Sequence, residues 1–116
     1  MIMEKPAKIR FRTARLRHDP IPASDMVAGR PRARTFLLHE EDGGRYACGI
    51  WQCTPGSFHW TFGKDEFVYF VEGEARIRYE DGRTIRVRAG EAAHFPEGRC
   101  LWTITKAVKK VFVARS

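Results

Sequence analysis

The segment Cys53–Gly73, CTPGSFHWTFGKDEFVYFVEG, combines turn signals, strand signals and candidate site residues within a short stretch of the chain. Pro55-Gly56 and the group Gly63-Lys64-Asp65 mark two turns, and the residues between them, Phe58–Phe62, predict a short strand. A second apolar run, Glu66–Val71, follows and is closed by Glu72-Gly73. The segment therefore predicts two adjacent strands joined by a tight turn.

Glu66 is the unusual residue of this segment, because an acidic side chain begins an otherwise apolar strand. If Glu66 faces the interior together with Val68 and Phe70, its carboxylate must find a partner or take up a proton. His59, on the preceding strand, is the nearest candidate partner. A structural alternative is that Glu66 accepts hydrogen bonds from Thr61 or from a backbone amide.

Length and composition are those of one ordinary folded domain. The chain has 116 residues, of which 43% are hydrophobic and 12% aromatic, and this is enough for one compact core. No run approaches the roughly 18 apolar residues that a membrane span needs, and the opening MIMEKPAKIRFR has no apolar block behind its charges. We expect a soluble, cytoplasmic protein that does not contact membranes.

The net charge of +7 raises the question of a nucleic-acid partner. Many arginines, however, alternate with apolar residues, as in Arg10-Phe11-Arg12 and Arg76-Ile77-Arg78, which is typical of the solvated face of a sheet. A nucleic-acid partner is therefore not expected, whereas an anionic small ligand is compatible with the pattern. The three cysteines, Cys48, Cys53 and Cys100, are an odd number, and this favours free thiols in a reducing compartment.

Short apolar or alternating runs, separated by turn residues at a spacing of about 8 to 12, predict an all-β sandwich or barrel. Asp81-Gly82 predicts a tight hairpin turn between two of these runs. We expect residues 1–32 to form an N-terminal arm and edge strand packed on a barrel of residues 33–116, within a single domain. The fragment Ser24–Ala28 is too short to predict a helix. The predicted strands are Ile9–Leu16, Thr35–His39, Tyr46–Cys53, Phe58–Phe62, Glu66–Val71, Ala75–Glu80, Arg83–Arg88, Ala92–Phe95, Leu101–Thr105 and Val108–Ala114.

Two spaced motifs resemble those of the cupins. Glu66 and Gly73, with six residues between them, resemble the end of the first cupin motif, and Gly90, Pro96 and Gly98 resemble the start of the second. The element Trp51-Gln52-Cys53-Thr54-Pro55-Gly56 and Trp102 narrow the resemblance to small single-domain cupins related to the (S)-ureidoglycine aminohydrolase cupin domain. This resemblance implies a cupin-type double-stranded β-helix, a jelly-roll barrel of two antiparallel sheets, with a ligand pocket in its mouth and pairing as a homodimer.

The resemblance also implies a set of metal ligands, of which this chain keeps a part. Metal-binding cupins use two histidines and a glutamate from the first motif and one histidine from the second. His59 and Glu66 match two of these positions, and Thr61 stands where the second histidine belongs. In the second motif strict spacing selects Leu101, whereas one extra residue selects Cys100, which alternation with Trp102 places inward. A metal such as Mn, Ni or Zn would then be held by His59, Glu66 and Cys100.

Because this donor set is incomplete, we expect a pocket that binds a small polar or anionic metabolite without an obligatory metal. His59 and Glu66 are the candidate catalytic residues, with Glu66 orienting the imidazole. The candidate pocket residues are Thr61, Val68, Cys100 and Trp102. One alternative is a metal-dependent hydrolase that acts on a carbon–nitrogen bond, and another is a structural or nucleic-acid-associated dimeric module. Whether the chain is an enzyme is left open.

Overall fold

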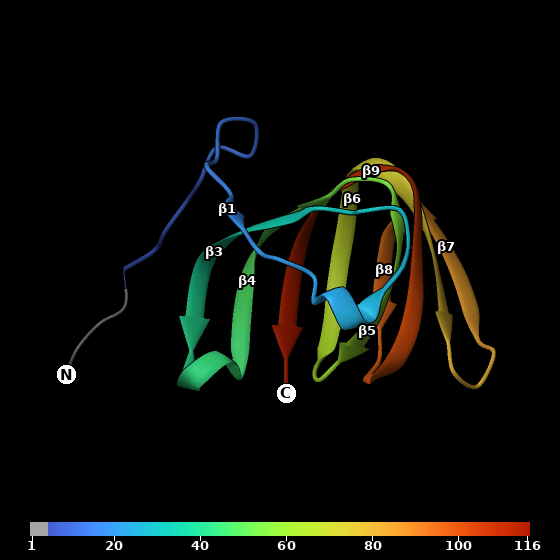
Figure 1. Cartoon of the computed structure of the whole chain (residues 1–116). Coiled ribbons are helices and arrows are strands. Elements are labelled where there is room, and N and C mark those ends of the chain that lie inside the picture. Colours follow the sequence, from blue (N-terminus) through green and yellow to red (C-terminus); the bar gives the residue numbers. More distant parts are fainter. Residues whose placement is uncertain (1–4) are drawn as a thin grey trace.

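Two long antiparallel strands, β6 (Asp65–Tyr79) and β9 (Gly98–Arg115), run through the whole fold (Figure 1). The structure, a computed structural model, describes residues 5–116, so the first four residues of the expected arm lie outside the described residues. The sequence predicted two strands in each of these regions. The chain instead continues in the β conformation across both, and the two strands pair from Asp65 with Arg115 to Tyr79 with Cys100.

The remaining strands add to the two ends of this pair, and together they form one hydrogen-bonded sheet that curls into two layers, called here the first and the second sheet. The first half of β6 pairs with β8 (Ala92–Phe95), and the second half of β9 pairs with β4 (Tyr46–Cys53). β4 continues the first sheet to β3 (Ala33–Glu41) and β1 (Arg17–His18). A 3-10 turn, η2 (Asp42–Gly44), joins β3 to β4.

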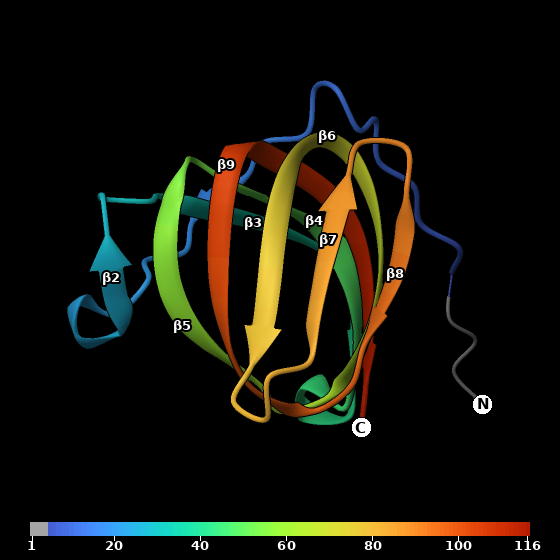
Figure 2. The ribbon, with the colours of Figure 1, turned by 90° about the vertical axis from the view of Figure 1, so that its right-hand side faces the viewer.

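The second sheet uses the other halves of the two long strands. The second half of β6 pairs with β7 (Thr84–Arg88), and the first half of β9 pairs with β5 (Gly56–Phe62), which carries β2 (Met26–Ala28). Figure 2 shows β5, β9, β6 and β7 side by side, with β3 and β4 behind them. The predicted all-β, cupin-type jelly roll of two antiparallel sheets is therefore confirmed.

An irregularity in β6 lets both of its halves bury apolar side chains. Val68 and Phe70 are buried in the first half, whereas Ala75 and Ile77 are buried in the second, so the inward-facing positions change from even to odd. The register with β9 shifts between Phe70 and Ala75, which accounts for this change. Gly73 lies within the shift at φ 91°, and a Cβ there would overlap the carbonyl oxygen of Ala107.

Aromatic side chains fill the space between the sheets. Trp102 is 2% exposed and stacks on Phe58 and Phe70 at ring-centroid distances of 6.2 and 6.4 Å. Phe62 and Phe95 stack on each other at 5.1 Å. Rings of this size remove a large apolar area from water, so this cluster contributes strongly to folding stability.

The N-terminal region differs from the prediction. Residues 9–16 do not form the expected edge strand, and β1 is limited to Arg17–His18. Side-chain contacts hold this segment instead, because Lys109 Nζ donates to the carbonyl oxygen of Phe11 at 3.0 Å and lies 4.4 Å from the centre of its ring. The helix-like fragment forms a 3-10 turn, η1 (Ala23–Asp25), followed by β2. Within residues 5–116, no helix has the length and apolar character needed to cross a bilayer.

Two glycines with nearly equal φ angles test the constraint in β6. Gly73 and Gly82 have φ values of 91° and 93°, but the space around Gly82 is open. We expect Gly82→Ala to lower the free energy of unfolding by about 1 kcal/mol through backbone strain alone. Gly73→Ala should lower it by more than about 3 kcal/mol, because the new methyl group also collides with the β9 backbone. Urea unfolding measures both losses, and equal losses would show that the close approach does not matter.

Candidate functional site

A cavity of about 280 Å³ opens between the inner faces of the two sheets. Strands β3, β4, β5, β6 and β9 contribute to its wall, which includes six aromatic side chains. Its lining residues are Asp19, Thr35, Leu37, Glu40, Ala47, Trp51, Phe58, Trp60, Thr61, Phe62, Gly63, Lys64, Glu66, Trp102, Lys110, Phe112 and Ala114. A small organic molecule fits a volume of this size.

An ion pair between Lys110 and Glu66 is the central polar feature of this cavity. Lys110 Nζ lies 2.8 Å from Glu66 Oε2, and the two side chains are 6% and 14% exposed. Among residues 5–116, Lys110 is the one charged residue that is buried. Burial of a charge is costly unless a partner compensates it. The Glu66 carboxylate supplies the opposite charge that allows the Lys110 ammonium to be buried.

Two indole rings add to the stabilisation of the Lys110 ammonium. Its Nζ lies 4.6 Å from the ring centre of Trp51 and 4.9 Å from that of Trp102. The strand register explains the arrangement, because Lys110 on β9 is the direct cross-strand neighbour of Trp51 on β4. Cation–π contacts of this kind gain strength when water is excluded.

The predicted pairing of Glu66 with His59 is wrong. Phe58 and Phe62 point into the core from β5, so the alternation of the strand directs His59 to the outer face, where its cross-strand neighbour is Leu101. Glu66 does face the cavity as expected, but the group that binds it is Lys110. The alternative partner, the Thr61 hydroxyl, does not bond to Glu66 either, because it is hydrogen-bonded to Arg99.

The other predicted pocket residues lie at different depths. Trp102 forms part of the cavity wall, and Thr61 lies at its rim, where its hydroxyl oxygen accepts a hydrogen bond from Arg99 Nη1 at 3.3 Å. Val68 is fully buried in the core and does not line the cavity. Cys100 faces inward and is 1% exposed, and its thiol donates to the carbonyl oxygen of Trp60 at 3.4 Å.

The proposed metal ligands do not fit a metal centre. His59 points away from Glu66, and Glu66 already contacts a cation. Burial raises the pKa of the Cys100 thiol to about 11, which disfavours the thiolate that a metal would need. Within residues 5–116, no group of three or more His, Cys, Asp or Glu side chains is arranged to hold a metal ion.

One polar group in the cavity wall lacks a satisfactory partner. The indole Nε1 of Trp102 is buried without a hydrogen-bond acceptor in acceptable geometry, and the weakly polar Cys100 thiol is the group that interacts with it. Buried indole N–H groups normally find an acceptor. The Nε1 atom is itself buried, and Cys100 does not line the cavity, so this donor is directed into the core and not toward the cavity.

Lys110 is the candidate site residue that the sequence motifs did not predict. It alternates with Val108 and Phe112 on the inner face of β9, while Lys109 and Val111 face outward. A lysine in a row of buried apolar residues is a signal that a carboxylate lies nearby, and Glu66 carries the complementary signal. Motif spacing could not join the two signals, because both cupin motifs end before Lys110.

Substitution of the carboxylate tests whether the ion pair supports the fold. Glu66→Gln keeps the shape of the side chain but leaves the Lys110 ammonium without a counter-charge, and we expect a loss of about 2–3 kcal/mol in the free energy of unfolding. Glu72→Gln, on the exposed part of the same strand, is the matched control and should change stability by less than about 0.5 kcal/mol.

The double variant Glu66→Gln/Lys110→Met completes this test, because it removes both charges from the cavity wall. It should recover much of the stability that Glu66→Gln loses, as measured by urea unfolding. If Glu66→Gln behaved like Glu72→Gln, the ion pair would have no role in stability.

The buried thiols predict a loss of stability at alkaline pH. Burial raises the pKa of Cys53 from 9.0 to about 12 and that of Cys100 from 9.0 to about 11. Between the unfolded and the folded pKa values, the unfolded chain has lost thiol protons that the folded chain keeps. The contribution of the thiols to the free energy of unfolding is therefore fully present below about pH 9. Above that pH it falls by roughly 1 kcal/mol per pH unit for each thiol. Urea unfolding between pH 8 and 10.5 measures this slope. Cys100→Ala should reduce the slope, and an unchanged slope would contradict the assignment.

Comparison with known proteins agrees with the fold. Residues 40–112, more than half of the chain, match the family described as the EutQ-like cupin domain. A curated relative, the acetate kinase EutQ of Clostridioides difficile (strain 630), is 32% identical over 62 residues, which are 53% of this chain. The match covers 39% of that relative, so the chain spans well under half of its length.

Solved structures give the same result. A protein assigned as ethanolamine utilization protein Q (EutQ) from Salmonella typhimurium LT2 superposes with a TM-score of 0.63 at 30% identity, covering 72% of this chain and 69% of that one. A protein of unknown function from Pseudomonas syringae pv. tomato has a TM-score of 0.77 at 26% identity, covering 89% of this chain and 45% of that one. Together with the two sheets and the cavity between them, these matches show that the chain belongs to the EutQ-like cupin domain family.

Proposed function

We propose that this cupin binds a small organic molecule in the cavity, without a metal, through contacts with the Lys110–Glu66 pair. The observation that carries the proposal is a buried ion pair in the wall of an open aromatic cavity. A buried ion pair gives little net stability compared with well-packed apolar residues, so its presence at a cavity wall favours a role in recognition.

The donors in the cavity wall favour a ligand with an acceptor group, such as a carboxylate. The Lys110 ammonium has three N–H bonds, and one of them is directed to Glu66. The aromatic rings would contact the apolar part of such a ligand.

The sequence also raised a metal-dependent hydrolase of the ureidoglycine aminohydrolase type. The contact between Lys110 and Glu66 counts against that alternative, because the ammonium takes the carboxylate that a metal would need and repels a second cation. The names of the relatives suggest probes instead. One relative is called an acetate kinase and another an ethanolamine utilization protein, so acetate and ethanolamine are the first molecules to test.

Ligand titration followed by tryptophan fluorescence tests this function, because Trp51 and Trp102 line the cavity. Acetate and propionate should change the emission in a saturable way, whereas ethanolamine, a cation, should not. Lys110→Met should weaken carboxylate binding by at least about tenfold, or about 1.4 kcal/mol, since it removes the main donor. Lys106→Met removes the same charge from an exposed position of β9 and should change affinity by less than about twofold. Equal binding by both variants would refute the proposal.

A further inference from the structure

The outer face of the second sheet carries three neighbouring arginines, Arg76 and Arg78 on β6 and Arg86 on β7. We call the surface formed by these arginines and Thr103 on β9 the arginine face. Arg76 is the direct cross-strand neighbour of Arg86 on one side and of Thr103 on the other. All three arginines are exposed. The strands that carry them, β7, β6 and β9, lie side by side in the foreground of Figure 2.

The positive charge of this face is not compensated. Like charges directly opposite each other on adjacent strands destabilise a sheet, and Arg76 and Arg86 are such a pair. In the described part of the chain, no carboxylate forms an ion pair with Arg76, Arg78 or Arg86.

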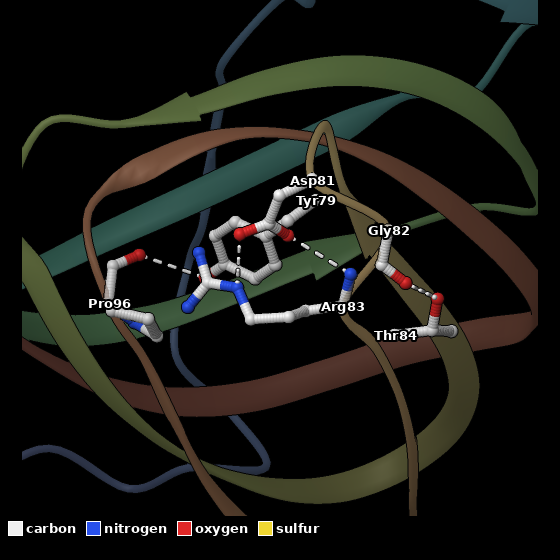
Figure 3. Close-up of polar contacts among 6 residues, drawn as sticks. All are labelled: Tyr79, Asp81, Gly82, Arg83, Thr84 and Pro96. Carbon is white, nitrogen blue, oxygen red and sulfur yellow. Dashed lines mark hydrogen bonds and ion pairs between the residues drawn. The ribbon is translucent and has the colours of Figure 1, made fainter.

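Each nearby acid is engaged by a different arginine. Glu74 Oε2 lies 3.3 Å from Arg88 Nε, and Glu80 Oε1 lies 3.6 Å from Arg99 Nε. Asp81, in the turn after β6, accepts hydrogen bonds from the backbone amide and the side chain of Arg83, at 3.0 and 2.6 Å (Figure 3). The acids around the arginine face are therefore not available to neutralise it.

The face is also hollowed. A depression of about 300 Å³ is lined by Arg76, Arg78, Gly82, Thr84, Leu101 and Thr103. A smaller one of about 100 Å³ adjoins it and shares Arg76 and Thr103, and its other lining residues are Arg86, Thr105 and Glu74, whose carboxylate is paired with Arg88. The Thr103 hydroxyl oxygen accepts a hydrogen bond from Ser57 at 3.3 Å, which leaves its own proton for another acceptor. Three guanidinium groups and a free hydroxyl donor thus line two adjoining depressions, and the one carboxylate in their walls, Glu74, is paired with Arg88.

We propose that the arginine face binds the phosphate group of a small phosphorylated molecule. A guanidinium presents a fork of N–H donors that matches phosphate oxygens, and one dianion placed between Arg76 and Arg86 would replace their repulsion by two attractive contacts. The larger depression has room for the small organic group that the phosphate carries. A nucleic-acid strand would need phosphate contacts over a longer track, but Arg83, Arg88 and Arg99, the arginines next to this face, are paired with Asp81, Glu74 and Glu80.

An NMR titration with glycerol 3-phosphate tests the proposal, with ionic strength held constant by NaCl and with glycerol as the uncharged control. The amides of β6, β7 and β9 around Arg76 and Thr103 should shift in a saturable way. Arg76→Gln should weaken binding by at least about tenfold, because it removes the guanidinium shared by both depressions. Arg12→Gln removes the same charge from the exposed N-terminal arm and should change affinity by less than about twofold.

Further measurements distinguish a phosphate site on the arginine face from binding in the cavity and from a nucleic-acid surface. Arg76→Gln should be at least as stable to urea as Arg12→Gln, since it relieves repulsion, so lost binding would not reflect lost folding. Lys110→Met should retain phosphate binding, and a loss in that variant would place the phosphate in the cavity instead. Equal weakening by Arg76→Gln and Arg12→Gln, or an absence of shifts, would overturn the proposal. Binding of a short single-stranded oligonucleotide about a hundredfold more tightly than glycerol 3-phosphate would also overturn it, by showing a nucleic-acid surface.

Discussion

The register shift in β6 is the constraint on which the arrangement of both proposed sites depends. Before the shift the even-numbered residues face inward, so Glu66 enters the cavity, and after it the odd-numbered residues do, so Ile77 is buried. Without the shift, Arg76 and Arg78 would point into the same interior as Glu66, and no core of this composition could bury them. The shift is compatible with close packing because Gly73 has no Cβ to collide with the β9 backbone. One local change of backbone therefore separates an interior carboxylate from an exterior row of cations.

Lys110 gives the cavity a cation that belongs to the protein. In the metal-binding cupins a glutamate of the first motif is a ligand, and here the matching residue, Glu66, binds an ammonium at 2.8 Å. An ammonium presents directed N–H donors, whereas a metal presents open coordination positions, so the chemistry available to a ligand changes from coordination to hydrogen bonding. The flanking indole rings disfavour water around the ammonium and so increase the effect of its charge.

The sequence predicted much of the fold because its strands alternate clearly and its turns carry glycine. Asp81-Gly82 was predicted as a hairpin turn, and the structure has Gly82 there at φ 93°. The side of His59 was assigned from motif spacing, although the local pattern on β5, with Phe58 and Phe62 on one face and His59 on the other, points outward. The Lys110–Glu66 contact joins residues 44 positions apart, and such a contact depends on strand order, which no local pattern contains. Residues 9–16 alternate weakly and do not form a strand, and Lys109 contacts this segment through the carbonyl oxygen of Phe11.

At both proposed sites, other residues at the same positions would give the fold a higher free energy of unfolding. Apolar residues in place of Lys110 and Glu66 would fill the cavity wall without burying charge, and an acid in place of Arg86 would turn a repulsive cross-strand pair into an attractive one. Sequences that specify a fold are expected to be consistent at every level, and departures from that consistency concentrate at functional sites. The acids next to the arginine face follow the rule, since Glu74, Glu80 and Asp81 each pair with a neighbouring arginine. The buried pair in the cavity wall and the facing arginines outside depart from it, and a bound carboxylate and a bound phosphate would compensate these charges.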